Sequence, residues 1–98
     1  MKEMKQMVVV MNDDRVTDVE AYLPHAKAFA KDAVEHDKGL ISMEVLTDPA
    51  VPGRVVYLSH FETEEDFRNH AAGATFQKHL PNLGPYFISA QDTILTVV

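Results

Sequence analysis

The sequence contains no cysteine, which excludes disulfide bonds, thiolate nucleophiles and cysteine-ligated metal sites. Basic residues are also scarce: nine lysines and arginines stand against fifteen aspartates and glutamates, and the formal net charge is −6. Because nucleic-acid binding needs clustered cations, this balance argues against a nucleic-acid partner. No apolar run approaches the ~20 residues of a membrane-spanning helix, so no membrane partner is expected.

The N-terminal segment has an apolar run too short for a signal peptide and no small-residue cleavage pattern. Together with the lack of cysteine, this predicts a cytoplasmic protein. A length of 98 residues predicts a single domain spanning residues 1–98. A chain this short buries only about two-thirds of its unfolded surface, so a large ligand cavity within one copy is not expected and oligomerisation is a common remedy.

The first half of the chain contains one strand pattern and one helix pattern. The continuous apolar run 6–11 predicts a buried strand, which should end at the turn-forming residues 12–14. The apolar period that follows Asp18 predicts a long helix with Asp18 as its N-cap and Gly39 just after its end. Pro24 should kink this helix near its start or mark a new helix start.

The second half predicts a hairpin, two helical pieces and a last strand. The strands are expected at 40–47, 54–61 and 87–98, with a Pro/Gly-containing loop between the first two. Thr63 is the expected cap of the next helix, and Gly73 should divide it from a short helical piece at 74–80.

This β-α-β-β-α-β order predicts an α+β, ferredoxin-like fold, in which an antiparallel sheet has its helices on one face. Apolar residues nevertheless occupy both alternating positions of the first and third strands. A sheet with one solvated face should instead alternate apolar and polar residues. We therefore expect the second face to be covered by the same sheet of another copy, giving a homodimer.

The pair Asp66 and His70 is the first candidate for a catalytic site. The two residues are four positions apart on the predicted helix, so the carboxylate can orient the imidazole, which leans towards the buried side of the helix. An oriented neutral histidine can act as a base, a hydrogen-bond donor or a ligand. The alternative is a half-buried histidine that a local carboxylate merely satisfies.

Three further polar residues are candidates for ligand contacts, each with a structural alternative. Tyr57 could hydrogen-bond a ligand or simply pack in its strand, and Asn12 could bind a substrate oxygen or begin a turn. His79 could border the same cleft or be solvated. No metal-binding motif, glycine-rich phosphate loop or nucleophile elbow is present, so no metal is expected.

Residues 38–83 resemble the antibiotic biosynthesis monooxygenase family, whose members are small dimeric α+β barrels. The resemblance rests on a glycine before the second strand, a Pro/Gly hairpin loop, an aromatic strand end, an acidic helix start, a histidine and a later phenylalanine. These residues are Gly39, Pro52-Gly53, Phe61, Glu64-Glu65, His70 and Phe76. The resemblance implies a homodimer formed through the sheets and a ligand cleft between sheet and helices in each subunit.

The sequence also departs from the family pattern. The third strand of family members often ends in Glu-x-Trp, whereas this chain has Ser59-His60-Phe61 and no tryptophan. Haem-degrading relatives resemble the same segment but carry a tryptophan where His70 stands and an axial histidine where Leu80 stands. Both differences make haem degradation less favoured.

The resemblance implies a cofactor-independent monooxygenase or related oxidoreductase that acts on a small aromatic or quinol-like compound. His70 would be the base or orienting group, held by Asp66, and Asn12, Tyr57 and His79 would be substrate contacts. The aromatic walls of the cleft would be Phe61 and Phe76. The alternatives are a non-catalytic small-molecule binding protein and a signal-molecule-processing enzyme of the same fold, because fold alone does not assign chemistry.

Overall fold

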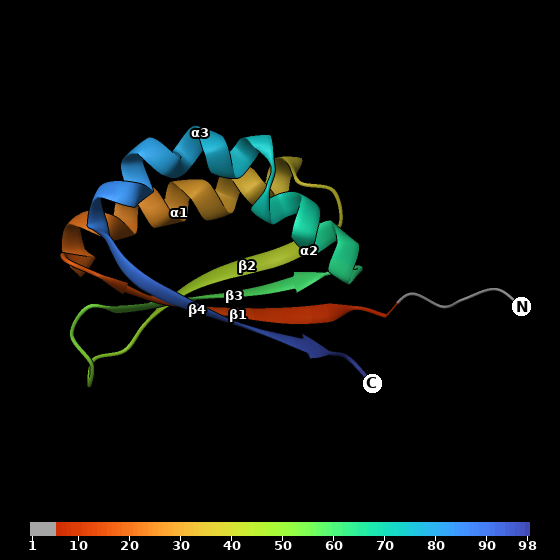
Figure 1. Cartoon of the computed structure of the whole chain (residues 1–98), viewed down its shortest axis with the longest axis horizontal. Helices are drawn as coiled ribbons and strands as arrows, with labels where there is room; N and C mark the ends of the chain where they lie inside the picture. Colours follow the sequence, from red (N-terminus) through yellow and green to blue (C-terminus); the bar gives the residue numbers. More distant parts are fainter. Residues whose placement is uncertain (1–5) are drawn as a thin grey trace, which may run out of the picture.

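The structure is a computed structural model that describes residues 6–98. Along the chain lie β1 (Val8–Val16), α1 (Val19–His36), β2 (Leu40–Thr47), β3 (Arg54–Phe61), α2 (Glu64–Ala71), α3 (Ala74–Leu83), a 3-10 turn η1 (Gly84–Tyr86) and β4 (Phe87–Thr96). The strands form one antiparallel sheet in the order β2-β3-β1-β4, and the α-helices lie on one face of it (Figure 1). The predicted ferredoxin-like α+β fold is confirmed.

Strand β1 differs most from the prediction, because it continues through residues 12–14, which were expected to form a turn. All three residues pair with both β3 and β4. Asn12 and Asp14 face the helices, whereas Asp13 faces the opposite side, where its Oδ2 lies 2.8 Å from the Arg54 guanidinium. Pairing with a strand on each side thus overrides the turn preference of these residues.

Helix α1 is one continuous helix that contains Pro24, so no new helix begins at the proline. Asp18 caps it as predicted, with its Oδ1 accepting a hydrogen bond from the Ala21 N–H at 3.1 Å. Pro24 is exposed, and its missing N–H removes one backbone hydrogen bond in the second turn, which the rest of an 18-residue helix tolerates. The buried residues of α1 are Tyr22, Ala26, Phe29, Ala30 and Ala33.

Two glycines shape the hairpin at its ends. Gly39 and Gly53 both have a positive φ, of 78° and 85°, which L side chains rarely adopt. A bulge between Leu40 and Ser42 then shifts the register of β2. Ile41, which lies at this bulge, is 48% exposed, although strict alternation along the strand would put it on the same side as Met43 and Val45.

The second helical region is divided at Gly73, as predicted, into α2 and α3. Thr63 caps α2, with its Oγ1 accepting a hydrogen bond from the Asp66 N–H at 3.1 Å. Gly73 serves as the N-cap of α3. The last turn of α3 runs into η1, which returns the chain to the sheet as the edge strand β4.

The core lies between the sheet and α1, where alternate residues of β1 and β3 pack against the helix. The opposite sheet face carries apolar side chains that are exposed or half-buried, while α1 to α3 all lie on the other side (Figure 1). These outer-face residues are Val9, Met11, Leu46, Val56, Leu58 and Leu95. Within residues 6–98, no helix combines the length and apolar character that crossing a membrane requires.

Candidate functional site

A cavity of about 430 Å³ lies between the sheet and the helices. Its volume falls in the range of roughly 300–1,000 Å³ that is typical of small-molecule sites. Side chains from every helix and from every strand line it, so the expectation that so short a chain would lack a large cavity was wrong. The apolar part of the wall consists of Val10, Phe29, Met43, Phe67, Ala71, Phe76, Leu80, Leu83, Phe87 and Ala90.

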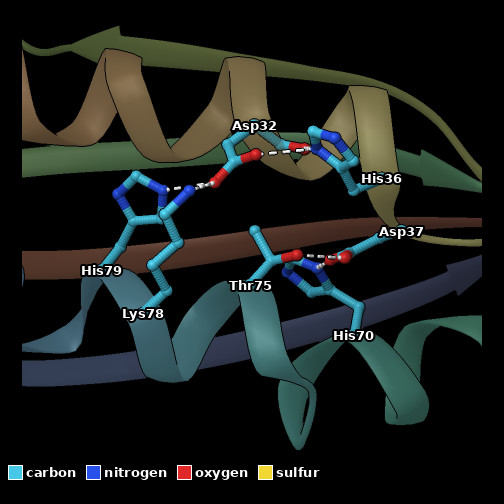
Figure 2. A network of polar contacts seen from close by, with 7 residues as sticks. All are labelled: Asp32, His36, Asp37, His70, Thr75, Lys78 and His79. Atoms are coloured by element: carbon cyan, nitrogen blue, oxygen red, sulfur yellow. Dashed lines mark hydrogen bonds and ion pairs between the residues drawn. The ribbon is translucent and has the colours of Figure 1, made fainter.

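His70 lines this cavity from α2, and it is 9% exposed. Its ring packs beside the rings of Phe29 and Phe61, with centroid distances of 5.6 and 5.3 Å. Its Nδ1 lies 2.5 Å from Asp37 Oδ2, and the other oxygen of Asp37 accepts a hydrogen bond from Thr75 Oγ1 at 2.6 Å (Figure 2). The hydrogen bonds that Asp37 makes to Thr75 and His70 therefore join the end of α1 to α3 and α2.

This hydrogen-bonded chain determines which nitrogen of His70 is available to a ligand. A carboxylate can only accept, so the bond to Asp37 places the proton of the neutral ring on Nδ1. The lone pair is then on Nε2, which has no hydrogen-bond partner within residues 6–98. A histidine held in this way can take a proton from a ligand in the cavity.

The prediction that Asp66 orients His70 was wrong, because Asp37 occupies that position. Asp66 is buried, but its carboxylate packs against Gly39: a Cβ added to Gly39 would lie 2.1 Å from Asp66 Oδ2. Spacing of four along a helix permits a contact but does not require one. The residue that meets the imidazole instead comes from the C-cap of α1, 33 positions away.

A second polar group lines the cavity near the other end of β1. The hydroxyls of Tyr22 and Tyr57 lie 2.5 Å apart, so one donates a hydrogen bond to the other. Burial, and then the hydrogen bond to Tyr22, raise the pKa of Tyr57, whereas burial raises the pKa of Tyr22 despite the opposing effect of the same hydrogen bond. Both hydroxyls are therefore protonated at neutral pH. Beside them, Asn12 Nδ2 donates a hydrogen bond to Asp92 Oδ1.

Asp14 is the residue of the described cavity wall that has a buried oxygen without a hydrogen-bond partner. It is 6% exposed, and its Oδ1 is buried without a hydrogen-bond partner in the part of the chain that the structure describes. Burial, and then repulsion from the carboxylates of Asp92 and Asp13, raise the pKa of Asp14 to about 7. A carboxyl with this pKa exchanges its proton near neutral pH.

The structure brings together only some of the residues predicted for the site. His70, Asn12, Tyr57 and Phe76 line the cavity, whereas Asp66, Phe61 and His79 do not. Phe61 is fully buried, where it packs beside Phe67 and His70 and supports the wall instead of forming it.

His79 belongs to a separate polar network centred on Asp32 of α1. Its Nε2 lies 2.7 Å from Asp32 Oδ2, and Lys78 and His36 contact the same carboxylate (Figure 2). Hydrogen bonds from His79 and then from Lys78 lower the pKa of Asp32 to about 2. This network ties α3 to α1, and the predicted role of His79 as a substrate contact finds no support in its position.

Sequence reasoning missed the residues Asp14, Tyr22, Asp37, Thr75 and Asp92. Asp14 was expected in a turn, and Asp37 stands in the polar segment that ends α1. Tyr22 did carry a usable signal, because it lies seven residues before Phe29 and therefore on the same side of the helix. No cluster of three or more metal-binding side chains occurs among residues 6–98.

Solved structures of similar fold come from several bacteria. A protein from Nitrosomonas europaea, provisionally described as an antibiotic biosynthesis monooxygenase, is 15% identical, with a TM-score of 0.84 over 100% of this chain and 96% of that one. A similarly described protein from Caulobacter crescentus is 13% identical, with a TM-score of 0.86 over 96% of this chain and 92% of that one. At these identities the likeness shows the fold alone.

A third solved structure is SnoaB from Streptomyces nogalater, described as a cofactor-independent oxygenase. It is 16% identical to this chain, with a TM-score of 0.78 over 95% of this chain and 94% of that one. None of the curated proteins compared with the sequence matched it. The family model for antibiotic biosynthesis monooxygenase matches residues 7–81, which include β1, the hairpin and the Asp37–His70 pair. The chain therefore belongs to the antibiotic biosynthesis monooxygenase family.

Proposed function

We propose that this protein is a cofactor-independent monooxygenase that oxidises a small aromatic or quinol-like compound in the cavity between sheet and helices. The observation that carries the proposal is the placement of His70 in the cavity wall, with Nδ1 fixed by Asp37. Family membership and the fold shared with SnoaB, a cofactor-independent oxygenase, add support.

In the proposed reaction His70 Nε2 removes a proton from the substrate, and Asp37 stabilises the imidazolium that forms. The resulting anion passes one electron to dioxygen, and the substrate radical and superoxide then combine to form a carbon–oxygen bond. A methylene between aromatic rings would thereby become a carbonyl, with the second oxygen atom leaving as water. Substrate and dioxygen supply every electron, so the reaction needs no external reductant.

The rest of the cavity suits this chemistry. Phe29, Phe67 and Phe76 provide an apolar enclosure that excludes water from an electron-rich ring. Within that enclosure hydrogen bonds and charges act more strongly than in water. Asp37 is a positioning residue in this proposal, because it acts on the substrate only through His70.

We further propose that the protein is a homodimer in which the outer faces of two sheets pack together. The outer face displays apolar residues such as Val56, Leu58 and Leu95, and Leu95 is 54% exposed. A contiguous apolar sheet face of this kind is typical of a protein–protein contact. A two-fold arrangement would bury the face in both copies at once.

A second candidate function is binding without turnover. The observation that favours it is the pairing already present in the cavity: Asn12 with Asp92, and Tyr22 with Tyr57. These four side chains already bond to one another, and His70 is the one histidine in the described wall, so the cavity offers few groups for catalysis. A binding protein would retain its ligand unchanged and be stabilised by it against heat.

The test is oxygen uptake with a panel of hydroquinones and anthrone-like phenols, with a metal chelator present and no flavin added. We expect uptake by the wild type and a loss of at least about 100-fold in His70→Ala, since a general base contributes roughly 10²–10⁴-fold. His36→Ala is the matched control, because His36 is an exposed histidine outside the cavity. Asp37→Asn should lower kcat while leaving KM nearly unchanged.

Unchanged turnover in His70→Ala would refute the role of that residue. No uptake by the wild type across the panel would refute the oxygenase proposal. If a panel compound then raised the melting temperature and was recovered unchanged, the binding function would be favoured.

A further inference from the structure

Asp14 is a charged side chain in the cavity wall that the proposed reaction does not use. It comes from the middle of the sheet, where β1 lies between β3 and β4, and it is only 6% exposed. Its Oδ1 has no hydrogen-bond partner within residues 6–98. Buried carboxyl oxygens are almost always paired, so an unpaired one at a cavity points to a ligand group.

The charged and polar groups around Asp14 do not neutralise its charge. Asp92 from β4 and Asp13 from the adjoining position of β1 repel it, and the hydroxyls of Tyr22 from α1 and Tyr57 from β3 are uncharged at neutral pH. The described lining of the cavity contains no lysine or arginine. An anionic ligand group would therefore be repelled at this position, whereas a hydrogen-bond donor would be attracted.

The Tyr22–Tyr57 pair adds a complementary hydrogen-bonding group. When one hydroxyl donates to the other, the hydroxyl that accepts still has its own proton to donate. That proton makes no hydrogen bond to another residue of the described chain. The tyrosine pair and the Asp14 carboxyl thus offer a donor and an acceptor at the same end of one cavity.

A hydroxyl is the ligand group that matches both, because it accepts one hydrogen bond and donates another. We propose that Asp14 and the Tyr22–Tyr57 pair form a subsite for a hydroxyl group of the ligand, which donates to the Asp14 carboxylate and accepts from a tyrosine hydroxyl. Binding favours the ionised carboxyl, so a ligand that enters while Asp14 is protonated releases that proton to solvent.

The subsite lies away from His70. Asp14 pairs with Val55 of β3, whereas His70 packs beside Phe61 of the same strand. The six residue steps from Val55 to Phe61 correspond to about 20 Å of strand. The proposal deepens the proposed function, since it rests on the same cavity holding the substrate, and it adds a hydroxyl remote from the carbon that His70 would deprotonate.

The test is a fluorescence titration with 2-naphthol and 2-methoxynaphthalene, which differ in the hydrogen-bond donor. Because the protein has no tryptophan, the fluorescence of either probe can be followed directly. Wild type at pH 8 should bind 2-naphthol roughly tenfold more tightly, which is the size expected for a hydrogen bond to a charged acceptor. The preference should weaken as the pH falls from 8 to 6, because Asp14 then gains a proton.

In Asp14→Asn both probes should bind with affinities within about threefold of each other, because an amide accepts a weaker hydrogen bond than a carboxylate, and the pH dependence should disappear. Asp18→Asn is the matched control, because it makes the same chemical change at the cap of α1, outside the cavity lining. It should retain the preference of the wild type. His70→Ala should also retain it.

The subsite would be refuted by a wild type that binds both probes equally or binds neither. It would also be refuted by an Asp14→Asn variant that keeps both the preference and its pH dependence while its circular dichroism shows a folded protein. Should that variant fail to fold, Tyr57→Phe replaces it, and full retention of the preference there contradicts the proposal. Oxygen uptake is not a readout here, so a failure of the oxygenase proposal is distinguished from a failure of the subsite.

Discussion

Replacing Asp14 by asparagine should change how the stability of this protein depends on pH. In the folded protein, burial and repulsion by neighbouring carboxylates raise the pKa of Asp14 from 3.8 to about 7. The folded state therefore holds this proton more tightly than the unfolded state does. Its stabilising contribution is fully present below pH 3.8 and is lost as the pH rises towards 7.

The magnitude follows from the two pKa values. Each pH unit between them costs ~1.4 kcal/mol of folding free energy, so the whole interval corresponds to ~4 kcal/mol. Of this contribution to the free energy of unfolding, the wild type loses ~2.5 kcal/mol between pH 5 and pH 8 and the remainder below pH 5. An asparagine side chain cannot titrate, so this part should be missing from the Asp14→Asn variant. The buried amide itself costs a similar amount at every pH and cancels from the comparison.

The assay is urea unfolding followed by far-ultraviolet circular dichroism at pH 5 and pH 8, at one fixed protein concentration. We expect the free energy of unfolding of Asp14→Asn, relative to wild type, to rise by ~2.5 kcal/mol between the two pH values. Asp18→Asn should show no such change, because asparagine is an equally good helix cap. Parallel pH dependence in wild type and Asp14→Asn would refute the reasoning, since Asp14 would then titrate as an ordinary surface carboxyl.

Two further predictions concern stability. Gly39→Ala should lower the free energy of unfolding by at least about 2 kcal/mol in urea, because its φ is 78° and the added Cβ would meet Asp66. Gly84→Ala, where φ is −57° and the nearest atom is 3.8 Å away, is the control, and equal losses in both would contradict the argument. Tyr22→Phe should cost about 1–3 kcal/mol, because it leaves the buried Tyr57 hydroxyl without its partner. A thermal melt indistinguishable from that of wild type would show that this hydroxyl pair contributes nothing.

The parts of the fold that depend on local pattern could be predicted from the sequence. Residues 40–47 and 54–61 alternate or are apolar and are bounded by turn residues, and both strands formed with those bounds. Thr63 was correctly predicted to begin α2, and Gly73 to divide α2 from α3, because helix ends depend on a few neighbouring residues. Alternation along β3 puts Tyr57, Ser59 and Phe61 on one face, and all three are buried.

The parts that depend on tertiary contacts could not be predicted in this way. Asn12 and Asp14 have turn preferences, and only pairing with β3 and β4 keeps them in a strand and points them into the cavity. His70 was identified from its position on a helix, but its partner Asp37 is distant in the sequence and no local spacing indicates it. Similarly, nothing near His79 in the sequence reveals that Asp32 holds it outside the cavity.

The two-residue period of β1 means that this strand can vary in composition more freely than in length. Asp14 serves the cavity, while Asp13, one position earlier, serves the ion pair with Arg54 on the opposite face. A deletion of one residue between Val8 and Asn12 would exchange the two faces. Asp13 would then enter the cavity without its arginine, and Asn12 and Asp14 would turn outward. We therefore expect natural variation in β1 to occur by substitution, with insertions and deletions confined to the segments beyond its ends.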